Sequence, residues 1–103
     1  MIQHTVVYRL KHPLNSAAEK DFQKAIGRLA EIPVVKGLKR LRQVSPKNKF
    51  TFGLSMEFDS MDDYRTYNEH PLHTDFVANR WVPEVADFLE IDYTNYGSDG
   101  ANG

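Results

Sequence analysis

The chain has 103 residues, of which 41% are hydrophobic and 26% charged, and its formal net charge is −1. This length and balance are typical of one globular domain, and no apolar run is long enough for a membrane-spanning helix. The absence of cysteine excludes disulfides, thiolate catalysis and thiolate metal ligands. The first residues lack the pattern of a signal peptide, and we expect a cytoplasmic protein.

Charge is distributed unevenly along the chain. Residues 36–49 carry six lysines and arginines and no acid, whereas residues 57–99 hold eleven of the fourteen acids. The basic segment could bind an anion or nucleic acid, or it could be an edge strand whose charges prevent association. We favour the edge strand, because the whole chain is not basic and no aromatic residues alternate with the basic ones. We therefore expect no nucleic-acid partner and no membrane partner.

The first half of the chain predicts strands on either side of a helix. Alternating apolar positions indicate half-buried strands. Ser16 and Glu19 form a capping box that begins a helix, and the apolar residues that follow have helical spacing. The expected elements are a strand at 2–10, a helix from 16 to about 32, a weak basic strand at 37–44, a connection at 45–49 and a strand at 50–58.

The second half predicts two short helices and a last strand. Ser60 is a suitable N-cap for the first of these helices. Pro71 lacks a backbone N–H and disfavours the helical conformation at His70, so this helix should end near His70. Pro71 is well suited to begin the second helix. Alternation then indicates a strand at 88–96.

The order β-α-β-β-α-β predicts an α+β, ferredoxin-like fold with a four-stranded antiparallel sheet and helices on one face. The most apolar strands, 2–10 and 50–58, belong at the centre of this sheet. The other face of the sheet is intermediate in character: it has more apolar residues than a solvent-exposed face and fewer than the core of a domain. We therefore expect a homodimer that packs sheet against sheet. The domain covers residues 1–96, and residues 97–103 have the composition of a flexible tail.

Three polar side chains converge in the expected helical layer. Alternation points His4 toward the helices, where Tyr67 and His73, on either side of the Pro71 break, can also point inward. Polar groups that converge in an apolar space are typical of a small-molecule site. Each of the three is also explained by core packing or a core hydrogen bond. His70 is expected to cap the break.

A metal site is not expected. His70 and His73 have an HxxH spacing, and Asp75 could add a ligand. A zinc site requires three or four ligands, however, and Pro71 turns the chain between the two histidines. The sequence also lacks a phosphate-binding loop, a nucleophile elbow and paired catalytic carboxylates. We therefore expect neither a metal nor another cofactor.

These residues resemble the stress-responsive dimeric α/β-barrel (Dabb) family over residues 1–96. The Tyr-x-x-His-Pro-x-His motif at 67–73 carries most of the resemblance. The early strand that contains His4 and the Ile-Asp-Tyr sequence at 91–93 are also similar. The resemblance implies a ferredoxin-like domain whose two copies pack sheet to sheet into a dimeric α/β-barrel.

The family includes a plant polyketide cyclase, and the similarity to it implies roles for single residues. His73 matches the base, and Tyr67 matches the donor that polarises a carbonyl group during an intramolecular aldol closure. A histidine that titrates near neutrality and a phenol that donates to an enolate oxygen suit this chemistry. A cyclase histidine on the third strand is matched here by Phe52, which changes the shape of the pocket. The expected substrate-binding residues are His4, Phe52, Tyr64, Phe76 and Trp81.

Two functions remain open. The first is a cofactor-independent cyclase or isomerase that acts on a carbonyl compound, polyketide-like or aromatic. The second is a non-enzymatic stress-response or ligand-binding dimer in which His4, Tyr67 and His73 are structural. A cavity open to solvent with an unpaired His73 would favour the first function. A buried network in which every polar group is paired would favour the second.

Overall fold

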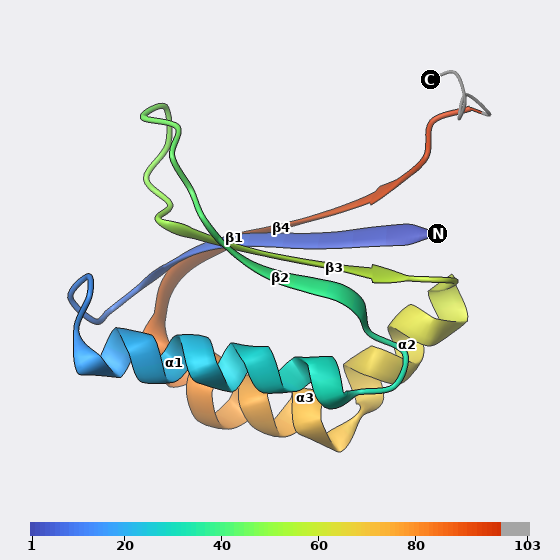
Figure 1. The fold of residues 1–103 in the computed structure, drawn as a ribbon, viewed down its shortest axis with the longest axis horizontal. Coiled ribbons are helices and arrows are strands. Elements are labelled where there is room, and N and C mark those ends of the chain that lie inside the picture. Colours follow the sequence, from blue (N-terminus) through green and yellow to red (C-terminus); the bar gives the residue numbers. More distant parts are fainter. Residues whose placement is uncertain (98–103) are drawn as a thin grey trace.

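The structure is a computed structural model that describes residues 1–97. Its elements follow the predicted order, and the helices lie together beneath one face of the sheet (Figure 1). The strands are β1 (Ile2–Leu10), β2 (Lys36–Arg42), β3 (Phe52–Phe58) and β4 (Val85–Thr94). The helices are α1 (Ala17–Gly27), α2 (Met61–Glu69), α3 (Pro71–Phe76) and α4 (Val82–Glu84), with a 3-10 helix η1 (Arg28–Glu31) and a π-helical segment η2 (Val77–Trp81).

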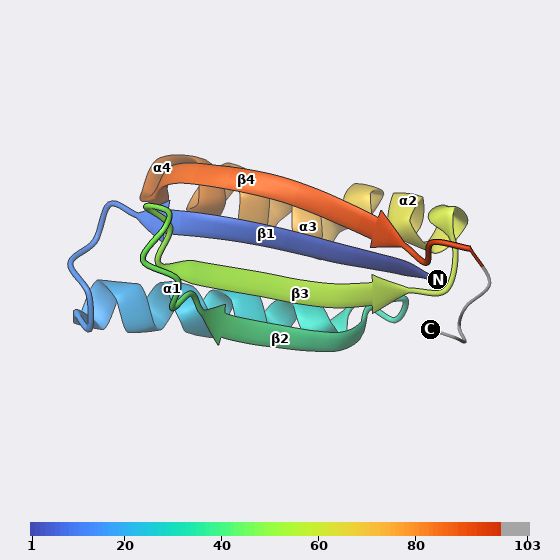
Figure 2. The ribbon, with the colours of Figure 1, turned by 90° about the horizontal axis from the view of Figure 1, so that it is seen from above.

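The four strands form one antiparallel sheet in the order β2-β3-β1-β4. The two most apolar strands, β1 and β3, occupy its centre, as predicted, and β2 and β4 are its edges (Figure 2). The α+β, ferredoxin-like fold predicted from the sequence is therefore confirmed. Among the described residues, no helix combines the length and the apolar character that crossing a membrane requires.

Both serines that were predicted to begin helices cap them, although the Glu19 side chain accepts from the backbone N–H of Asn15 and not from that of Ser16. The Ser16 hydroxyl accepts a hydrogen bond from the backbone N–H of Glu19 at 3.1 Å. The Ser60 hydroxyl accepts one from the backbone N–H of Asp63, also at 3.1 Å. Each bond satisfies one of the backbone donors that the first turn of a helix leaves free.

The boundaries of several elements differ from the predicted ones. The third strand begins at Phe52, because the side chain of Asn48 accepts a hydrogen bond from the backbone N–H of Phe50 and holds that residue in the turn. The α3 helix continues through η2 and α4 to Glu84, so β4 begins at Val85 and ends at Thr94. The predicted tail at 97–103 lies, except for Gly97, outside the described residues.

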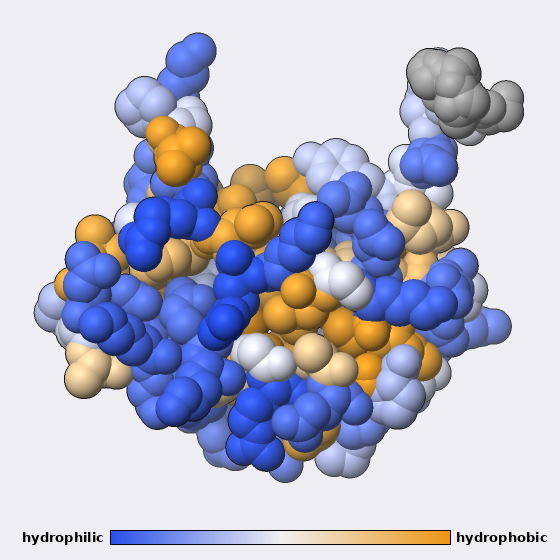
Figure 3. All heavy atoms as spheres, viewed as in Figure 1, coloured by the Kyte–Doolittle hydropathy of each residue, from blue (hydrophilic) through white to orange (hydrophobic). Residues whose placement is uncertain are grey.

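The core fills the space between the sheet and the helices. Seen from the side, hydrophobic residues show between these two layers and are framed by hydrophilic ones (Figure 3). Aromatic side chains dominate the core, and burying each of them contributes roughly 1.5–3 kcal/mol relative to exposing it. The large side chains that are fully buried are Tyr8, Phe22, Ile26, Ile32, Met56, Phe58 and Tyr67.

The face of the sheet that the helices leave uncovered carries a band of apolar side chains. In the register of the sheet, Val7 lies between Leu89 and Gly53, and Thr5 lies between Ile91 and Ser55. Strand β4 therefore directs Glu90, Asp92 and Phe88 toward the helices, and Leu89, Ile91 and Tyr93 away from them. The large apolar side chains of this face, each between 40% and 52% exposed, are Leu41, Leu89, Ile91 and Tyr93.

Candidate functional site

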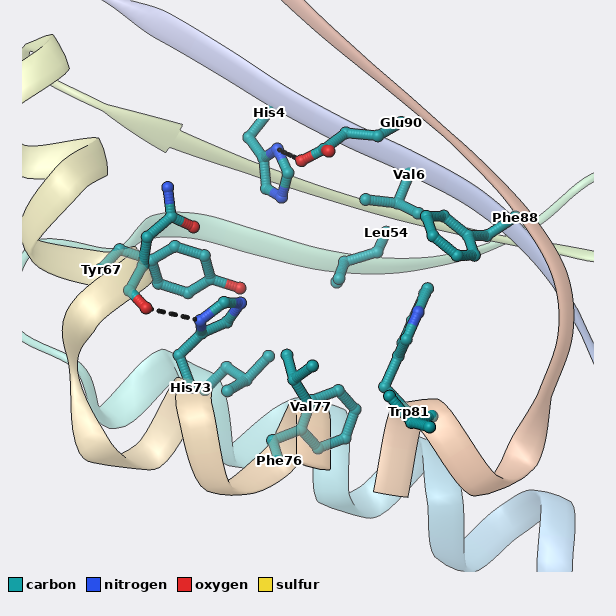
Figure 4. Close-up of a pocket in the computed structure, with 13 residues that line it drawn as sticks. His4, Val6, Leu54, Tyr67, His73, Phe76, Val77, Trp81, Phe88 and Glu90 are labelled. Atoms are coloured by element: carbon teal, nitrogen blue, oxygen red, sulfur yellow. Dashed lines mark hydrogen bonds and ion pairs between the residues drawn. The ribbon is translucent and has the colours of Figure 1, made fainter. Parts of the chain in front are cut away.

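A cavity of about 360 Å³ lies between the sheet and the helical layer (Figure 4). One part of its wall is polar and the rest is aliphatic or aromatic, a combination that suits a small molecule with a few oriented polar groups. The polar lining residues are His4, Tyr67, Asn68, His73 and Glu90. The apolar ones are Val6, Leu29, Leu54, Phe76, Val77, Trp81, Val82 and Phe88.

The break between α2 and α3 positions two of the polar groups. His70 has an extended backbone conformation, and its Nδ1 accepts a hydrogen bond from the backbone N–H of Leu72 at 3.1 Å. His70 therefore caps α3, and Pro71 is the first residue of that helix. The resulting turn brings Tyr67 from the last turn of α2 against His73 from the first turn of α3, with ring centroids 4.3 Å apart.

His73 has a defined tautomer. Its Nδ1 lies 3.1 Å from the backbone oxygen of Asn68. Because a carbonyl oxygen can only accept, Nδ1 carries the proton and Nε2 retains its lone pair. Figure 4 shows this second nitrogen on the side of the Tyr67 hydroxyl, facing the cavity. Burial lowers the pKa of His73 below its ordinary value of 6.5, so the imidazole is a neutral base at pH 7.

Tyr67 provides a protonated hydroxyl in the same space. The residue is only 2% exposed, and none of the described residues forms a hydrogen bond to its hydroxyl group. Burial is also the main reason that the pKa of Tyr67 is raised, which keeps the phenol protonated. Its hydroxyl is therefore available to donate a hydrogen bond to a ligand in the cavity.

His4 belongs to a hydrogen-bonded cluster beside the cavity. The residue is 4% exposed, and its Nδ1 lies 2.6 Å from Asp92 Oδ1. The Tyr64 hydroxyl lies 3.0 Å from the same nitrogen, 2.8 Å from Asp92 Oδ2 and 3.0 Å from Glu90 Oε2. Because a carboxylate can only accept, Nδ1 of His4 carries a proton, and the other ring nitrogen points toward the cavity (Figure 4).

Sequence reasoning missed the two acids of this cluster, Glu90 and Asp92. Alternation over the last strand separates these acids from Leu89 and Ile91, but it does not say which set faces the helices. The structure pairs His4 with Asp92 across the β1–β4 ladder. The alternation was therefore an available signal, and the deciding information was the pairing register of two strands far apart in the sequence.

The structure brings together five of the residues predicted for the site, since His4, Tyr67, His73, Phe76 and Trp81 all line the cavity. Tyr64 contacts His4 from outside the lining. Phe52 lies elsewhere, because it pairs with Tyr8 on β1, whereas His4 pairs with Met56. Four residues along a strand separate these positions by about 13 Å. Phe52 packs on the Tyr8 ring, with centroids 5.5 Å apart.

The described residues contain one group of side chains with metal-ligating atoms close together. The atoms belong to His4, Glu90 and Asp92 and lie within 4.8 Å of one another. The HxxH pair, His70 and His73, is not part of that group. The Nδ1 atom of His70 bonds to the backbone of Leu72, and that of His73 bonds to Asn68, so each is used in holding the helix break.

Comparison with known proteins places the chain in a family. The model of the stress responsive A/B barrel domain, Dabb, matches residues 2–95. A Dabb family protein with a ferredoxin-like fold from Mesorhizobium loti is 50% identical, with 93% of this chain and 97% of that chain covered and a TM-score of 0.91.

Two more distant structures share the fold. A hydroxynitrile lyase from Passiflora edulis is 21% identical, with 94% of each chain covered and a TM-score of 0.82. A dimeric ferredoxin-like protein of unknown function from Thermobifida fusca is 22% identical, with 91% of this chain and 90% of that chain covered and a TM-score of 0.76. Among curated proteins, none matches the sequence. The chain belongs to the stress responsive A/B barrel domain family.

Proposed function

We propose that the protein is a homodimeric, cofactor-independent enzyme of cyclase or isomerase type that removes a proton beside a carbonyl group. The observation that carries this proposal is the state of His73. Its imidazole is neutral, its Nδ1 is held by Asn68, and its Nε2 faces a cavity that also contains the Tyr67 hydroxyl. A positioned base beside a hydrogen-bond donor is the arrangement that proton abstraction requires.

The chemistry divides between these two side chains. The carbonyl oxygen of the substrate accepts a hydrogen bond from the Tyr67 hydroxyl, and His73 Nε2 removes a proton from the adjacent carbon. The electron pair of the broken C–H bond forms an enolate, whose oxygen is stabilised by the Tyr67 donor. In a cyclase, the enolate carbon then attacks a second carbonyl of the same molecule, and the imidazolium protonates the new alkoxide. In an isomerase, the imidazolium returns the proton at a different carbon.

The remainder of the cavity supports a carbon-rich substrate. Its volume of about 360 Å³ lies within the range of small-molecule pockets, roughly 300–1,000 Å³. Trp81 and Phe88 stand opposite the polar end, with ring centroids 5.5 Å apart. These rings provide the apolar contact area that an aromatic or polyketide-like chain needs.

One observation favours a non-enzymatic ligand-binding dimer instead. His4, Tyr64 and Asp92 are bonded to one another, so His4 can be a structural residue. The unbonded Nε2 of His73 and the opening of the cavity to solvent favour the enzyme. Enzymatic use of this fold also has a precedent, since the Passiflora edulis protein of the same architecture is a hydroxynitrile lyase.

The homodimer is proposed on the uncovered face of the sheet. Leu41, Leu89, Ile91 and Tyr93 form an exposed apolar band there, larger than single scattered side chains. Packing two such faces together would bury this band and complete a barrel. Proteins of the same fold from Thermobifida fusca and Bacteroides fragilis are described as dimeric, which supports this assembly.

Proton exchange tests the enzyme without knowledge of the full reaction. A panel of methyl ketones and β-diketones is incubated with the protein in D₂O, and loss of the signal of the α-proton is followed by NMR. We expect wild-type protein to accelerate exchange of at least one compound. His73→Ala should reduce that acceleration by about 100-fold or more, the usual size of a general-base contribution.

Two further variants complete the test. Tyr67→Phe should slow exchange while circular dichroism remains that of the wild type. His12→Gln is the matched control, because His12 bonds to Glu84 outside the cavity, and its exchange rate should equal that of the wild type. Exchange that is as fast in His73→Ala as in the wild type would contradict the proposed role.

A further inference from the structure

Among residues 1–97, Glu90 is the only aspartate, glutamate, lysine or arginine in the cavity lining. Its side chain is 49% exposed, and its nearest ion-pair partner is His4 Nδ1 at 3.5 Å. No lysine or arginine among residues 1–97 forms an ion pair with it, in contrast to Asp87, which pairs with Arg9, and Glu84, which pairs with Arg80. The carboxylate of Glu90 is therefore without a permanent cation.

The neighbouring groups do not saturate this carboxylate. The Tyr64 hydroxyl lies within hydrogen-bond distance of both Glu90 and Asp92, but it has one proton and can donate to only one acid at a time. The proton on His4 Nδ1 is directed at Asp92, at 2.6 Å. Glu90 and Asp92 therefore share the protons of Tyr64 and His4, and Glu90 gives the part of the cavity wall formed by β4 a negative charge.

The charge of Glu90 also acts on the two proposed reacting groups. It contributes to the raised pKa of Tyr67 and partly counteracts the lowering of the pKa of His73 by burial. Because Glu90 lines the same cavity as Tyr67 and His73, its carboxylate would act on a ligand between these residues and would repel a ligand carboxylate or phosphate there.

Aromatic rings form the apolar end of the same cavity. Phe88 lies two residues before Glu90 on β4 and therefore on the same side of the strand. The Trp81 ring meets Phe88 edge to face, with centroids 5.5 Å apart. These rings provide apolar contact area for the remainder of a ligand whose ammonium group lies at the Glu90 carboxylate.

We infer that the cavity selects ligands that carry an ammonium group over ligands that carry a carboxylate, and that Glu90 is the residue that determines this selection. The inference rests on the proposed small-molecule function of the cavity and narrows its substrate class to amine-bearing compounds. Such a ligand would place its cation at Glu90, its apolar part against Trp81 and Phe88, and its carbonyl group at Tyr67.

Three small probes with one ring and different charges test the selection. Benzylamine is a cation at neutral pH, benzyl alcohol is neutral and benzoate is an anion. Each is titrated into isotope-labelled protein, and the indole N–H signal of Trp81, the single tryptophan of the chain, reports binding in the cavity. We expect benzylamine to bind about fivefold more tightly than benzyl alcohol, the upper range for an exposed ion pair, and benzoate to bind most weakly. Added salt should reduce the differences.

Variants at one position connect the selection to its residue. Glu90→Gln should bring the affinities for benzylamine and benzoate together, and Glu90→Asp should keep benzylamine preferred. Glu69→Gln makes the same change of charge at the exposed end of α2 and should behave as the wild type.

The outcomes separate the two proposals. Benzoate binding at least as tightly as benzylamine, or an unchanged ratio in Glu90→Gln, overturns the charge selection while leaving the cavity a ligand site. If no probe moves the Trp81 signal, the small-molecule function itself is contradicted, and the selection with it.

Discussion

The bond between His4 and Asp92 should contribute measurably to stability, and a double-mutant cycle can isolate its contribution. The two side chains meet at 2.6 Å, with 6% of the His4 side chain and 35% of the Asp92 side chain exposed. A hydrogen bond to a charged group contributes about 1.5–3 kcal/mol when buried. Since water reaches Asp92 and weakens the electrostatic attraction, we expect a coupling energy of about 1–2 kcal/mol.

The perturbations are His4→Phe, Asp92→Asn and the double variant. Phenylalanine keeps a ring of similar shape against Phe58 and Tyr67, whose centroids lie 6.3 and 6.0 Å from that of His4. Asparagine keeps the shape of Asp92 without its charge. Each single change should lower the free energy of unfolding, and the double variant should lose less than the sum of the two.

Urea unfolding, followed by Trp81 fluorescence and by circular dichroism, measures all four free energies. Protein concentration must be equal in every sample, because the stability of a dimer depends on it. Independent sites add within about 0.3–0.5 kcal/mol. A coupling energy below that limit would show that the short contact contributes nothing, and His4 would then have to be held by packing alone.

Three further predictions concern the helix break, the base and the dimer. His70→Ala should lose about 1 kcal/mol of stability with the α3 cap, whereas His70→Asn, which retains a capping group, should lose less; thermal unfolding of the two variants measures the difference. Because the pKa of His73 is lowered in the folded protein, the unfolded chain takes up a proton first as the pH falls. The contribution of His73 to the free energy of unfolding should therefore be fully present above pH 6.5 and should be lost as the pH falls below that value. Urea midpoints compared across pH should show a smaller decline in His73→Ala than in the wild type. Gly53→Glu places a charge on the uncovered face, where an added Cβ meets only ordinary contacts; light scattering should show monomer, while Ala78→Glu on the helical side should remain dimeric. A dimeric Gly53→Glu protein would contradict the assembly through this face.

The parts of the fold that sequence reasoning predicted correctly are those in which local chemistry decides the structure. Ser16 and Ser60 are good caps in any context, and Pro71 interrupts a helix whatever surrounds it. The boundaries of β3 and β4 were less predictable. Phenylalanine is common in strands, but the backbone N–H of Phe50 donates a hydrogen bond to the Asn48 side chain, which holds Phe50 in the turn before β3.

The candidate site was predictable on its helical side and not on its sheet side. The Tyr67–His73 pair follows from the short segment 67–73, in which Pro71 separates the two helices that carry these side chains. The acids Glu90 and Asp92 reach His4 only because β4 pairs with β1 in one register and directs Leu89, Ile91 and Tyr93 away from the helices. This orientation is unusual for a single domain and is explained if a second copy covers the apolar face, which is information that no single strand contains.

The pairing of β1 with β4 also has a consequence for synthesis of the protein. These neighbouring strands begin at residues 2 and 85, so one edge of the central strand stays unpaired until the last part of the domain has left the ribosome. At about 5–20 residues per second, this interval lasts roughly 4–17 s. During this interval a chaperone or a neighbouring nascent copy can occupy the open edge of β1 before β4 of the same chain arrives.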